Sequence, residues 1–368
     1  MPDLGVRLQL LIGPEIPAPA PFALVDALAE LTVQSNDRER DGFQLTFTLG
    51  KQPQGDYNLL RLGLLAPPAR VMIIVLINAR PQILIDGVIT NHQLRASNQP
   101  GQSTLTVTGE DISFQMDREE KRLTHRNLSD SQIVTQIVSS YGLVPEVTAT
   151  DDVPIEARRV PSQHGTDLAY VRELARRNGF VFYVEPTELP GVCQAYWGPT
   201  KRQGQAQPPL TMNMGPHTNV DQPIAFQYDA LAPAEAHVRV LDGEARRAID
   251  VARPSGDLPA LASQVARPLR KILPPSTARL STALGSLRMQ AENSQAADAI
   301  TATGEVDAVR YGRVLRSRGL VSVRGAGQAY NGVYYVAQVT HQIRRGEYRQ
   351  RFTLRREGLG AKSSAVAT

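Results

Sequence analysis

The sequence predicts a mainly β chain with α+β insertions, in which two similar antiparallel β-units lie near the beginning and the end. Period-two alternation of apolar and polar residues fills most of the first third and the last part of the 368 residues, a pattern typical of half-buried strands. Two segments near residues 130 and 170 follow helical periodicity instead. A His-Gln-aliphatic triplet, a turn and an alternating strand occur twice, from His92 and from His341.

Composition indicates a globular protein with more than one core. The chain is 42% hydrophobic and 21% charged, which excludes a disordered chain, and its length suggests two to four compact units. The net charge of +4 is spread along the sequence, so it does not by itself indicate a nucleic-acid partner. Cys193 is the only cysteine, which excludes an intrachain disulfide framework.

The sequence shows no targeting or membrane signal. Its first residues lack the basic start and long apolar core of a signal peptide, and no apolar run reaches transmembrane length. The most apolar run, Val71 to Ile77, is short and β-branched, which is typical of a buried strand. We therefore expect a protein that is cytoplasmic on synthesis and has no membrane segment.

Residues 1–115 are assigned to a first antiparallel β-domain, a small barrel or sandwich. Gly42 to Gly50 and Ser103 to Asp111 alternate clearly and predict strands. Between them, two apolar strands are expected to meet at a turn over Asn78 to Arg80. Asp86-Gly87 is expected to form a kink or a tight turn in the second of them.

Residues 116–190 are predicted to form a small α+β domain with two helices. Ser129 is the expected N-cap of the first helix, with Gln132 three residues later as in a capping box, and Gly142 ends it. Apolar residues recur on one face of this helix: Ile133, Val134, Ile137, Val138 and Tyr141.

The second helix carries clearer start and stop signals. Thr166 or Asp167 caps its beginning, and Gly179 ends it. Arg176 and Arg177 lie in its last turn, where the carbonyl end of a helix favours cations. Its apolar stripe consists of Leu168, Val171, Leu174 and Ala175. The apolar and aromatic residues that follow, 180–184, predict a strand.

Residues 191–245 together with 300–360 are assigned to a second β-domain. Its last strands are expected within residues 313–327, 332–343 and 348–356. The segment 246–299 between the two parts is amphipathic and broken by prolines, so we expect an inserted segment with short helices.

The repeated hairpin indicates a structural duplication. Asp86-Gly87 precedes the first triplet and Asn331-Gly332 precedes the second, with an apolar strand upstream of each. Chance similarity is the alternative, because all β-hairpins share alternation and turn residues. If the chain forms a trimer, six similar units would surround one axis, and a threefold assembly would present a nearly sixfold surface.

The segment VPSQHGTDLAYVRELARRNGFVFYV, residues 160–184, resembles the signature of the phage late control gene D family, the baseplate hub proteins. The matching positions are Gly165, Thr166, Asp167, Leu168, Tyr170, Leu174, Gly179, Phe180, Phe182 and Tyr183. Residues 331–356 look like the family's ending, and residues 84–121 look like its first tube-forming domain. The resemblance covers about residues 25–358 and is closest to hub proteins of extracellular contractile injection systems, which are phage tail-like particles.

This resemblance implies two tube-like antiparallel β-barrel domains per chain and a homotrimer that forms a pseudo-hexameric ring. The implied function is that of a structural baseplate hub of a contractile injection system or phage tail, which adapts the sixfold inner tube to the threefold spike. The implied partners are the inner tube protein ring, a separate spike protein and other baseplate components, within an assembled virion or released particle. Residues 246–294 have no counterpart in the family pattern, which leaves their role open.

Enzymatic chemistry is not expected from the sequence. The histidines are His92, His125, His164, His217, His237 and His341. None has a ligand at metal-binding spacing, and no G-x-S-x-G motif occurs, so no catalytic, cofactor-binding or metal residues are assigned. Asp151-Asp152 and Glu119-Glu120 are expected in solvated loops, and Cys193 as a packed or loosely exposed thiol. His92 and His341, at matching repeat positions, are expected to form hydrogen bonds near their hairpins.

The final hairpin is basic. Alternation places Phe352 and Leu354 on one face of its last strand and Arg349, Arg351 and Thr353 on the other. The arginines that add to this charge are Arg344, Arg345, Arg355 and Arg356. A solvated face that protects a strand edge and a channel-lining or ring-facing surface that meets acidic partner residues are equally consistent with this pattern. Nucleic-acid contact is less favoured, because aromatic residues are not interleaved.

Two other functions are alternatives to the hub. A carbohydrate- or cell-wall-binding β protein would need exposed aromatic platforms, but the chain has one tryptophan and 5% aromatic residues. A peptidoglycan hydrolase of a baseplate would need a site that the sequence does not show.

Overall fold

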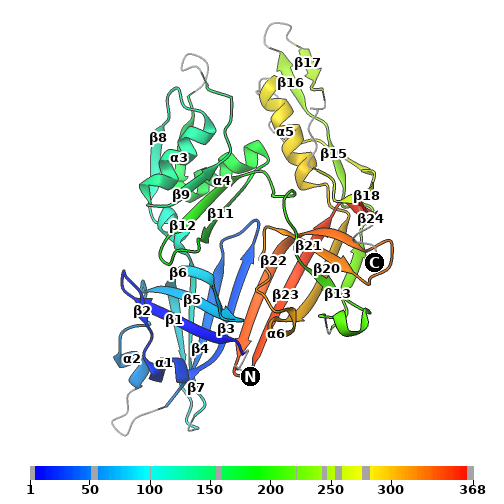
Figure 1. Ribbon diagram of the computed structural model, residues 1–368. Coiled ribbons are helices and arrows are strands. Elements are labelled where there is room, and N and C mark those ends of the chain that lie inside the picture. Colours follow the sequence, from blue (N-terminus) through cyan, green and yellow to red (C-terminus); the bar gives the residue numbers. More distant parts are fainter. Residues whose placement is uncertain are drawn as a thin grey trace.

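The computed structural model describes residues 5–50, 57–99, 101–154, 160–220, 222–242, 247–252, 259–275 and 282–362. The fold is mainly β with α+β insertions, as predicted, and one large sheet runs through the molecule (Figure 1). Its strands follow the order β14-β20-β23-β22-β3-β4-β7-β6-β5-β1-β2, with β21 and β13 branching from β22. All neighbours are antiparallel except β13 and β21, which are parallel.

The first half of the sheet comes from the first 111 residues. Its strands are β1 (Arg7–Gly13), β2 (Ala18–Pro19), β3 (Leu28–Asn36), β4 (Gly42–Leu49), β5 (Arg70–Ile77), β6 (Arg80–Arg95) and β7 (Ser103–Asp111). Two short helices cover one end, α1 (Phe22–Ala27) and α2 (Asn58–Arg61). The inward side chains of these strands form one apolar core, which includes Leu31, Leu45 and Val107 at 0% exposure.

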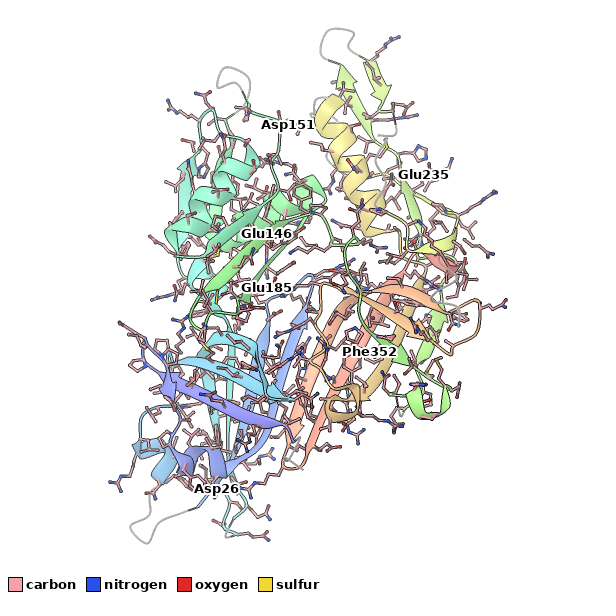
Figure 2. All side chains as sticks on the ribbon, in the orientation of Figure 1. Asp26, Glu146, Asp151, Glu185, Glu235 and Phe352 are labelled. Atoms are coloured by element: carbon pink, nitrogen blue, oxygen red, sulfur yellow. The ribbon has the colours of Figure 1, made fainter. Side chains whose placement is uncertain are left out.

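The second half of the sheet is formed mainly by the end of the chain. Its elements are β13 (Gln207–Thr211), β14 (Ala225–Tyr228), β20 (Ile300–Asp307), α6 (Ala308–Tyr311), β21 (Leu320–Arg324), β22 (Gly332–Arg344) and β23 (Glu347–Arg356). They enclose a second apolar core. Phe352 and Leu354 are buried on one face of β23, as alternation predicts, and Phe352 is labelled in Figure 2.

The two halves repeat one strand order, so the duplication expected from the hairpins is present. The first half contains β3-β4-β7-β6-β5 and the second β14-β20-β23-β22-β21, each linked by hydrogen bonds in that sequence. A short helix lies in the same connection of each, α2 between β4 and β5 and α6 between β20 and β21. The halves join where β22 pairs with β3.

The two histidines of the repeated triplets are not equivalent, which corrects the sequence prediction. Each hairpin has a bulge at the same place in the repeat, leaving Thr90 unpaired in β6 and Ala337 unpaired in β22. Counted from the bulge, His92 is the second residue and His341 the fourth. His92 is exposed, whereas His341 is buried at 2% exposure. The two triplets share the same residue types, but they lie at different positions relative to the bulge of their strands.

The expected turn at Asn78 to Arg80 is present, but Asp86-Gly87 forms no tight turn, and the irregularity of β6 lies just before it, at Leu84. Asn78 and Ala79 have positive φ angles of 52° and 60° between β5 and β6. Gly87 lies inside β6, opposite Val71 on one side and Asp111 on the other. Pairing on both edges holds this stretch extended, and it overrides the turn preference of an Asp-Gly pair.

A cross-strand pair of phenylalanine and glycine occurs in both halves. Phe43 of β4 lies opposite Gly109 of β7, and Phe352 of β23 lies opposite Gly304 of β20. A Cβ atom on Gly109 would lie 2.3 Å from the ring of Phe43 and 2.4 Å from the carbonyl oxygen of Val88. The ring therefore occupies the space that a side chain at the glycine would need.

Replacing Gly109 with alanine is expected to lower the free energy of unfolding by about 1–3 kcal/mol, the usual cost of overpacking. Gly42→Ala is a matched control, because a Cβ there would lie 3.4 Å from its nearest neighbour, the carbonyl oxygen of Gly109. Urea denaturation of both variants measures the difference. Equal midpoints for the two variants would contradict the packing argument.

Residues 112–198 form an α+β arm at one end of the sheet (Figure 1). Its elements are η1 (Ile112–Asp117), β8 (Glu120–Thr124), α3 (Asp130–Ser140), β9 (Val144–Val147), β10 (Ser162–Thr166), α4 (Asp167–Asn178), β11 (Val181–Pro186) and β12 (Cys193–Gly198). The capping box of Ser129 and Gln132 is present. Thr166 is the N-cap of α4, and Gly179 ends α4 in the left-handed conformation. The arm extends beyond residue 190, because β12 pairs with β11.

Residues 234–295 form a second projection, the inserted arm, which lies on the same end of the sheet (Figure 1). Its elements are β15 (Ala234–Ala236), β16 (Arg239–Asp242), β17 (Arg247–Asp250), β18 (Ala262–Val265), β19 (Arg270–Ile272) and α5 (Thr282–Gln295). The prediction of short helices in residues 246–299 is wrong for the described part. One helix of 14 residues packs against short strands, and β18 and β19 pair with β24 (Gly358–Ala361) and β15, distant partners that no local pattern reveals.

Candidate functional site: an arginine-lined cleft

The residues with nucleophilic or metal-binding chemistry are dispersed. Among the described residues, no three of the His, Cys, Asp and Glu side chains are placed to hold a metal ion. The Cys193 sulfur lies 3.8 Å from Asp86, and burial raises the pKa of this thiol to about 12, so it is a poor nucleophile at neutral pH. The carboxylates of Asp151-Asp152 and Glu119-Glu120 are all exposed. No helix in the described part of the chain is long and apolar enough to cross a membrane.

Asp167, in the Gly-Thr-Asp-Leu segment, connects the elements of the α+β arm. Its carboxylate accepts hydrogen bonds from Lys121 (2.6 Å), Tyr141 (2.7 Å) and Gln163 (2.7 Å), which belong to β8, the end of α3 and β10. Burial alone would raise the pKa of Asp167, but these hydrogen bonds outweigh it and lower the pKa. Three hydrogen bonds from three elements therefore hold this carboxylate in place within the arm.

The basic hairpin is neutralised within the chain. Its arginines pair with carboxylates of neighbouring elements: Arg344 with Glu30, Arg345 with Asp26, Arg349 with Glu305 and Glu347, Arg351 with Glu305, and Arg355 with Asp37. Asp26 is labelled in Figure 2, at the end of the molecule opposite the arms. Exposed pairs of this kind stabilise a fold little, but they leave few free cations on the hairpin.

Arg356 is not part of the exposed basic surface to which it was assigned. Its side chain is fully buried, and its guanidinium donates hydrogen bonds to the carbonyl oxygens of Gly358 (2.8 Å), Asn331 (2.9 Å) and Ala329 (3.1 Å). The guanidinium also lies 4.2 Å from the ring centre of Tyr334. Period-two alternation already places residue 356 on the buried face of β23, a signal that the charge of arginine obscured.

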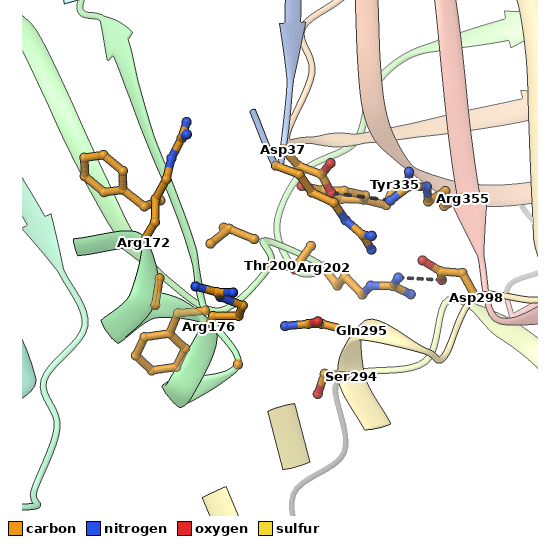
Figure 3. Close-up of a pocket in the computed structure, with 16 residues that line it drawn as sticks. Asp37, Arg172, Arg176, Thr200, Arg202, Ser294, Gln295, Asp298, Tyr335 and Arg355 are labelled. Atoms are coloured by element: carbon orange, nitrogen blue, oxygen red, sulfur yellow. Dashed lines mark hydrogen bonds and ion pairs between the residues drawn. The ribbon is translucent and has the colours of Figure 1, made fainter. Parts of the chain in front are cut away.

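Uncompensated cations gather in a different place, a cleft at the base of the two arms (Figure 3). We call it the arginine cleft. It has a volume of about 330 Å³ and lies between the ends of α4 and α5, the turn after β3 and the end of β23. Its charged lining residues are Arg38, Arg172, Arg176, Arg202, Arg355, Asp37 and Asp298. Five arginines against two aspartates give the lining a formal charge of +3.

Arg202 forms a fixed wall of the cleft. Its side chain is 4% exposed, and it donates to Asp298 (2.5 Å) and to Glu357 (3.0 Å), as Figure 3 shows for Asp298. Both carboxylates are therefore committed to Arg202. Its Nε atom is buried without a hydrogen-bond partner.

The other arginines of the cleft have weak partners or none. The Nη1 atom of Arg355 lies 3.9 Å from the Oδ2 atom of Asp37, a long distance for an ion pair. Burial raises the pKa of the Asp37 carboxyl, so this group is a weaker negative partner for the arginine. Arg38 and Arg176 have no carboxylate within ion-pair distance among the described residues, whereas the charge of Arg172 interacts with the carboxylates of Asp111, Asp117 and Glu110. The Nε atom of Arg172 is buried without an acceptor, and burial lowers the pKa of this guanidinium.

The rest of the lining combines apolar surface with hydrogen-bonding groups. Phe180, Phe182 and Tyr335 supply aromatic surface, and Thr200, Ser294 and Gln295 supply polar atoms; these six are lining residues of the cleft. Both helices reach the cleft with their carbonyl ends, which carry partial negative charge. The arrangement suits a ligand that has carboxylates, hydrogen-bond donors and apolar surface together.

At Gly179, the end of α4 in the α+β arm lies directly against α5 of the inserted arm. It has a φ of 70° at the end of α4, and a Cβ atom there would lie 2.7 Å from the Cα atom of Ala291 in α5. The sequence predicted Gly179 as a helix end, but its contact with α5 could not be predicted from the sequence. The cleft was also missed, because its arginines come from four separate segments, a turn, a helix, a loop and a strand, whose local patterns do not show that they meet.

Comparisons with known proteins were made for sequence and for structure. A family model described as the Alg8 N-terminal domain matches residues 33–190, which is less than half of the chain. This range begins inside β3 and ends before β12, so it cuts through two sheets of the structure. No curated protein matches the sequence.

The fold is similar to those of solved tail proteins over nearly the whole chain. The tail protein of Neisseria meningitidis MC58 is 13% identical, with a TM-score of 0.64, over 97% of this chain and 98% of that one. The 43 kDa tail protein of prophage MuSo2 from Shewanella oneidensis is 12% identical, with a TM-score of 0.62, over 96% and 99%. An E. coli component of the type VI secretion system, described as similar to the T4 tail proteins gp27 and gp5, is 14% identical, with a TM-score of 0.54, over 93% and 75%.

Proposed function

We propose that the chain is a structural component of a phage tail or a tail-like contractile particle, and that it serves there as the baseplate hub. The observation that carries this proposal is the likeness of fold to two tail proteins, one of them from a prophage, along almost the full length of each chain. The duplicated strand order supports the narrower role of hub. The resemblance to the late control gene D family points to the same role.

The hub role requires three copies around one axis. Each copy contributes two sheet halves with the same strand order, so three copies present six similar units to a sixfold inner tube. The long strand path ends at β2 and β14, whose outer edges have no strand partner among the described residues. Such edges are suited to pairing between copies. The other proposed partners are a separate spike protein and further baseplate components.

We propose that this role involves no bond chemistry. The two alternative functions have less support. A carbohydrate-binding surface needs exposed aromatic rings, but Trp197 is fully buried, and among the described residues Phe22 and Tyr228 are the exposed large aromatic side chains. A hydrolase needs paired catalytic groups, and the acidic pairs singled out in the sequence lie apart on exposed segments.

We expect the purified chain, mixed with the tube protein of its own particle, to form a species that contains three copies. The part of the light-scattering mass that is due to this chain should then be three times its mass of 40.2 kDa. Electron microscopy should show a threefold ring with six similar lobes. A hub chain that remains single in the presence of the tube protein would refute the proposal. Turnover of peptidoglycan by the isolated chain would favour the hydrolase instead.

A further inference from the structure

We propose that the arginine cleft binds an acidic peptide segment of a partner protein. The carboxylates of the segment would pair with Arg38 and Arg176, and an apolar side chain would lie on the aromatic surface of Phe180 and Phe182. This inference concerns a binding site and does not depend on the symmetry of the assembly.

The first argument is the contrast between two groups of arginines in one chain. On the hairpin, the exposed arginines have carboxylate partners in neighbouring strands or in helix α1. In the cleft, the two aspartates of the lining serve Arg202 and Arg355, so Arg38 and Arg176 are left without an ion-pair partner among the described residues. Cations brought together at one place without counter-charges repel one another, and an anionic ligand removes that repulsion.

The second argument is the chemistry of the guanidinium groups that the cleft offers on Arg38 and Arg176. Carboxylate oxygens match the planar guanidinium better than water does, since both groups present two parallel hydrogen-bonding positions.

The third argument selects a peptide over a phosphate compound. Polyphosphates favour the amino ends of helices, but α4 and α5 both turn their carbonyl ends to this cleft. A peptide has N–H groups that these ends and Gln295 can accept, as well as side chains that can cover aromatic surface. A volume of about 330 Å³ is near the lower limit of ligand pockets, which suits a few residues of an extended segment.

The test uses isothermal titration calorimetry on the full chain at low salt. The probe is an acetylated, amidated peptide of alternating glutamate and leucine with one phenylalanine, and the reference peptide has lysine at each glutamate position. We expect the acidic peptide to bind and the lysine peptide not to bind. In the double variant Arg38→Gln/Arg176→Gln, affinity should fall at least tenfold. Both residues are exposed, so the substitutions should leave the fold intact.

The matched control is Arg344→Gln/Arg345→Gln, which removes two exposed arginines that have carboxylate partners at the hairpin tip. This variant should bind the acidic peptide as the unchanged chain does. If both double variants lost the same affinity for the acidic peptide, the binding would depend on net charge alone, and the proposal would be overturned. Displacement of the peptide by millimolar inorganic phosphate, or tighter binding of a single-stranded oligonucleotide at the same arginines, would also overturn it. Ring formation by either variant is measured separately, so failure here leaves the hub proposal standing.

Discussion

Replacing Arg318 with methionine is expected to lower the free energy of unfolding by about 3–5 kcal/mol, the usual cost of breaking a buried ion pair. The Arg318 side chain is 4% exposed. It donates to the carboxylate of Asp41 and, at 2.7 Å and 3.0 Å, to the carbonyl oxygen of Asn36. Its guanidinium lies 4.1 Å from the ring centre of Tyr183. One side chain thus joins the second half of the sheet to the first half and to the α+β arm.

The size of this loss depends on pH through Asp41. Burial raises the pKa of this carboxyl to about 7, even with Arg318 beside it, and without Arg318 the pKa would rise further. Below about pH 7 Asp41 is protonated in the folded state of both chains, so the loss caused by the substitution should be nearly independent of pH there. The loss should grow above about pH 7, where the unchanged chain can ionise Asp41 beside Arg318 and the variant cannot.

Urea denaturation at several pH values measures this effect. The matched control is Arg351→Met, which breaks an exposed pair with Glu305 and should cost less than about 1 kcal/mol. Adding Asp41→Asn to the Arg318 variant should remove the additional loss above about pH 7, because no carboxyl is then left to ionise at that position. A loss from Arg318→Met no larger than that from Arg351→Met would show that the junction does not stabilise the fold.

The second large effect is acid destabilisation through His341. This imidazole is buried, and the Tyr348 hydroxyl lies 3.0 Å from its Nδ1 atom. Burial, with a smaller contribution from the charge of Arg316, lowers the pKa of His341 to about 3. The unfolded chain takes up this proton near pH 6.5 and the folded chain does not, so stability should fall as the pH drops from 6.5 toward 3. The limiting slope is about 1.4 kcal/mol per pH unit.

The variant His341→Gln removes the titrating group and keeps an acceptor for Tyr348. The free energy of unfolding of this variant should change less between pH 6.5 and about pH 4 than that of the unchanged chain. His92→Gln, at an exposed position of β6, should leave the dependence on pH as it was. If the slope persists in His341→Gln, the acid sensitivity arises from other groups.

Local signals in the sequence identified the elements that are determined locally. The caps at Ser129 and Thr166 and the helix end at Gly179 follow from hydrogen bonds within one turn, and all are present. Alternation in β23 placed Phe352 correctly, because period two fixes the face of a strand whatever its neighbours are.

Distant partners determined the features that the sequence did not reveal. Asp86-Gly87 stays extended because β5 and β7 pair with it on both sides. Arg318 follows a serine and precedes a glycine, a pattern that indicates a solvated turn, yet its partners lie about 280 residues earlier in the chain. The arginine cleft likewise depends on four segments meeting, so charge patterning drew attention to the hairpin instead.

The junction between β22 and β3 gives the protein a directional response to load. Seven residue pairs, from Gln338 and Asn36 to Arg344 and Glu30, link the two halves of the sheet. A pull along these strands shears all the linking hydrogen bonds at once, whereas a pull across them breaks the bonds one after another, like a zipper. The molecule should therefore withstand tension along this seam far better than peeling across it.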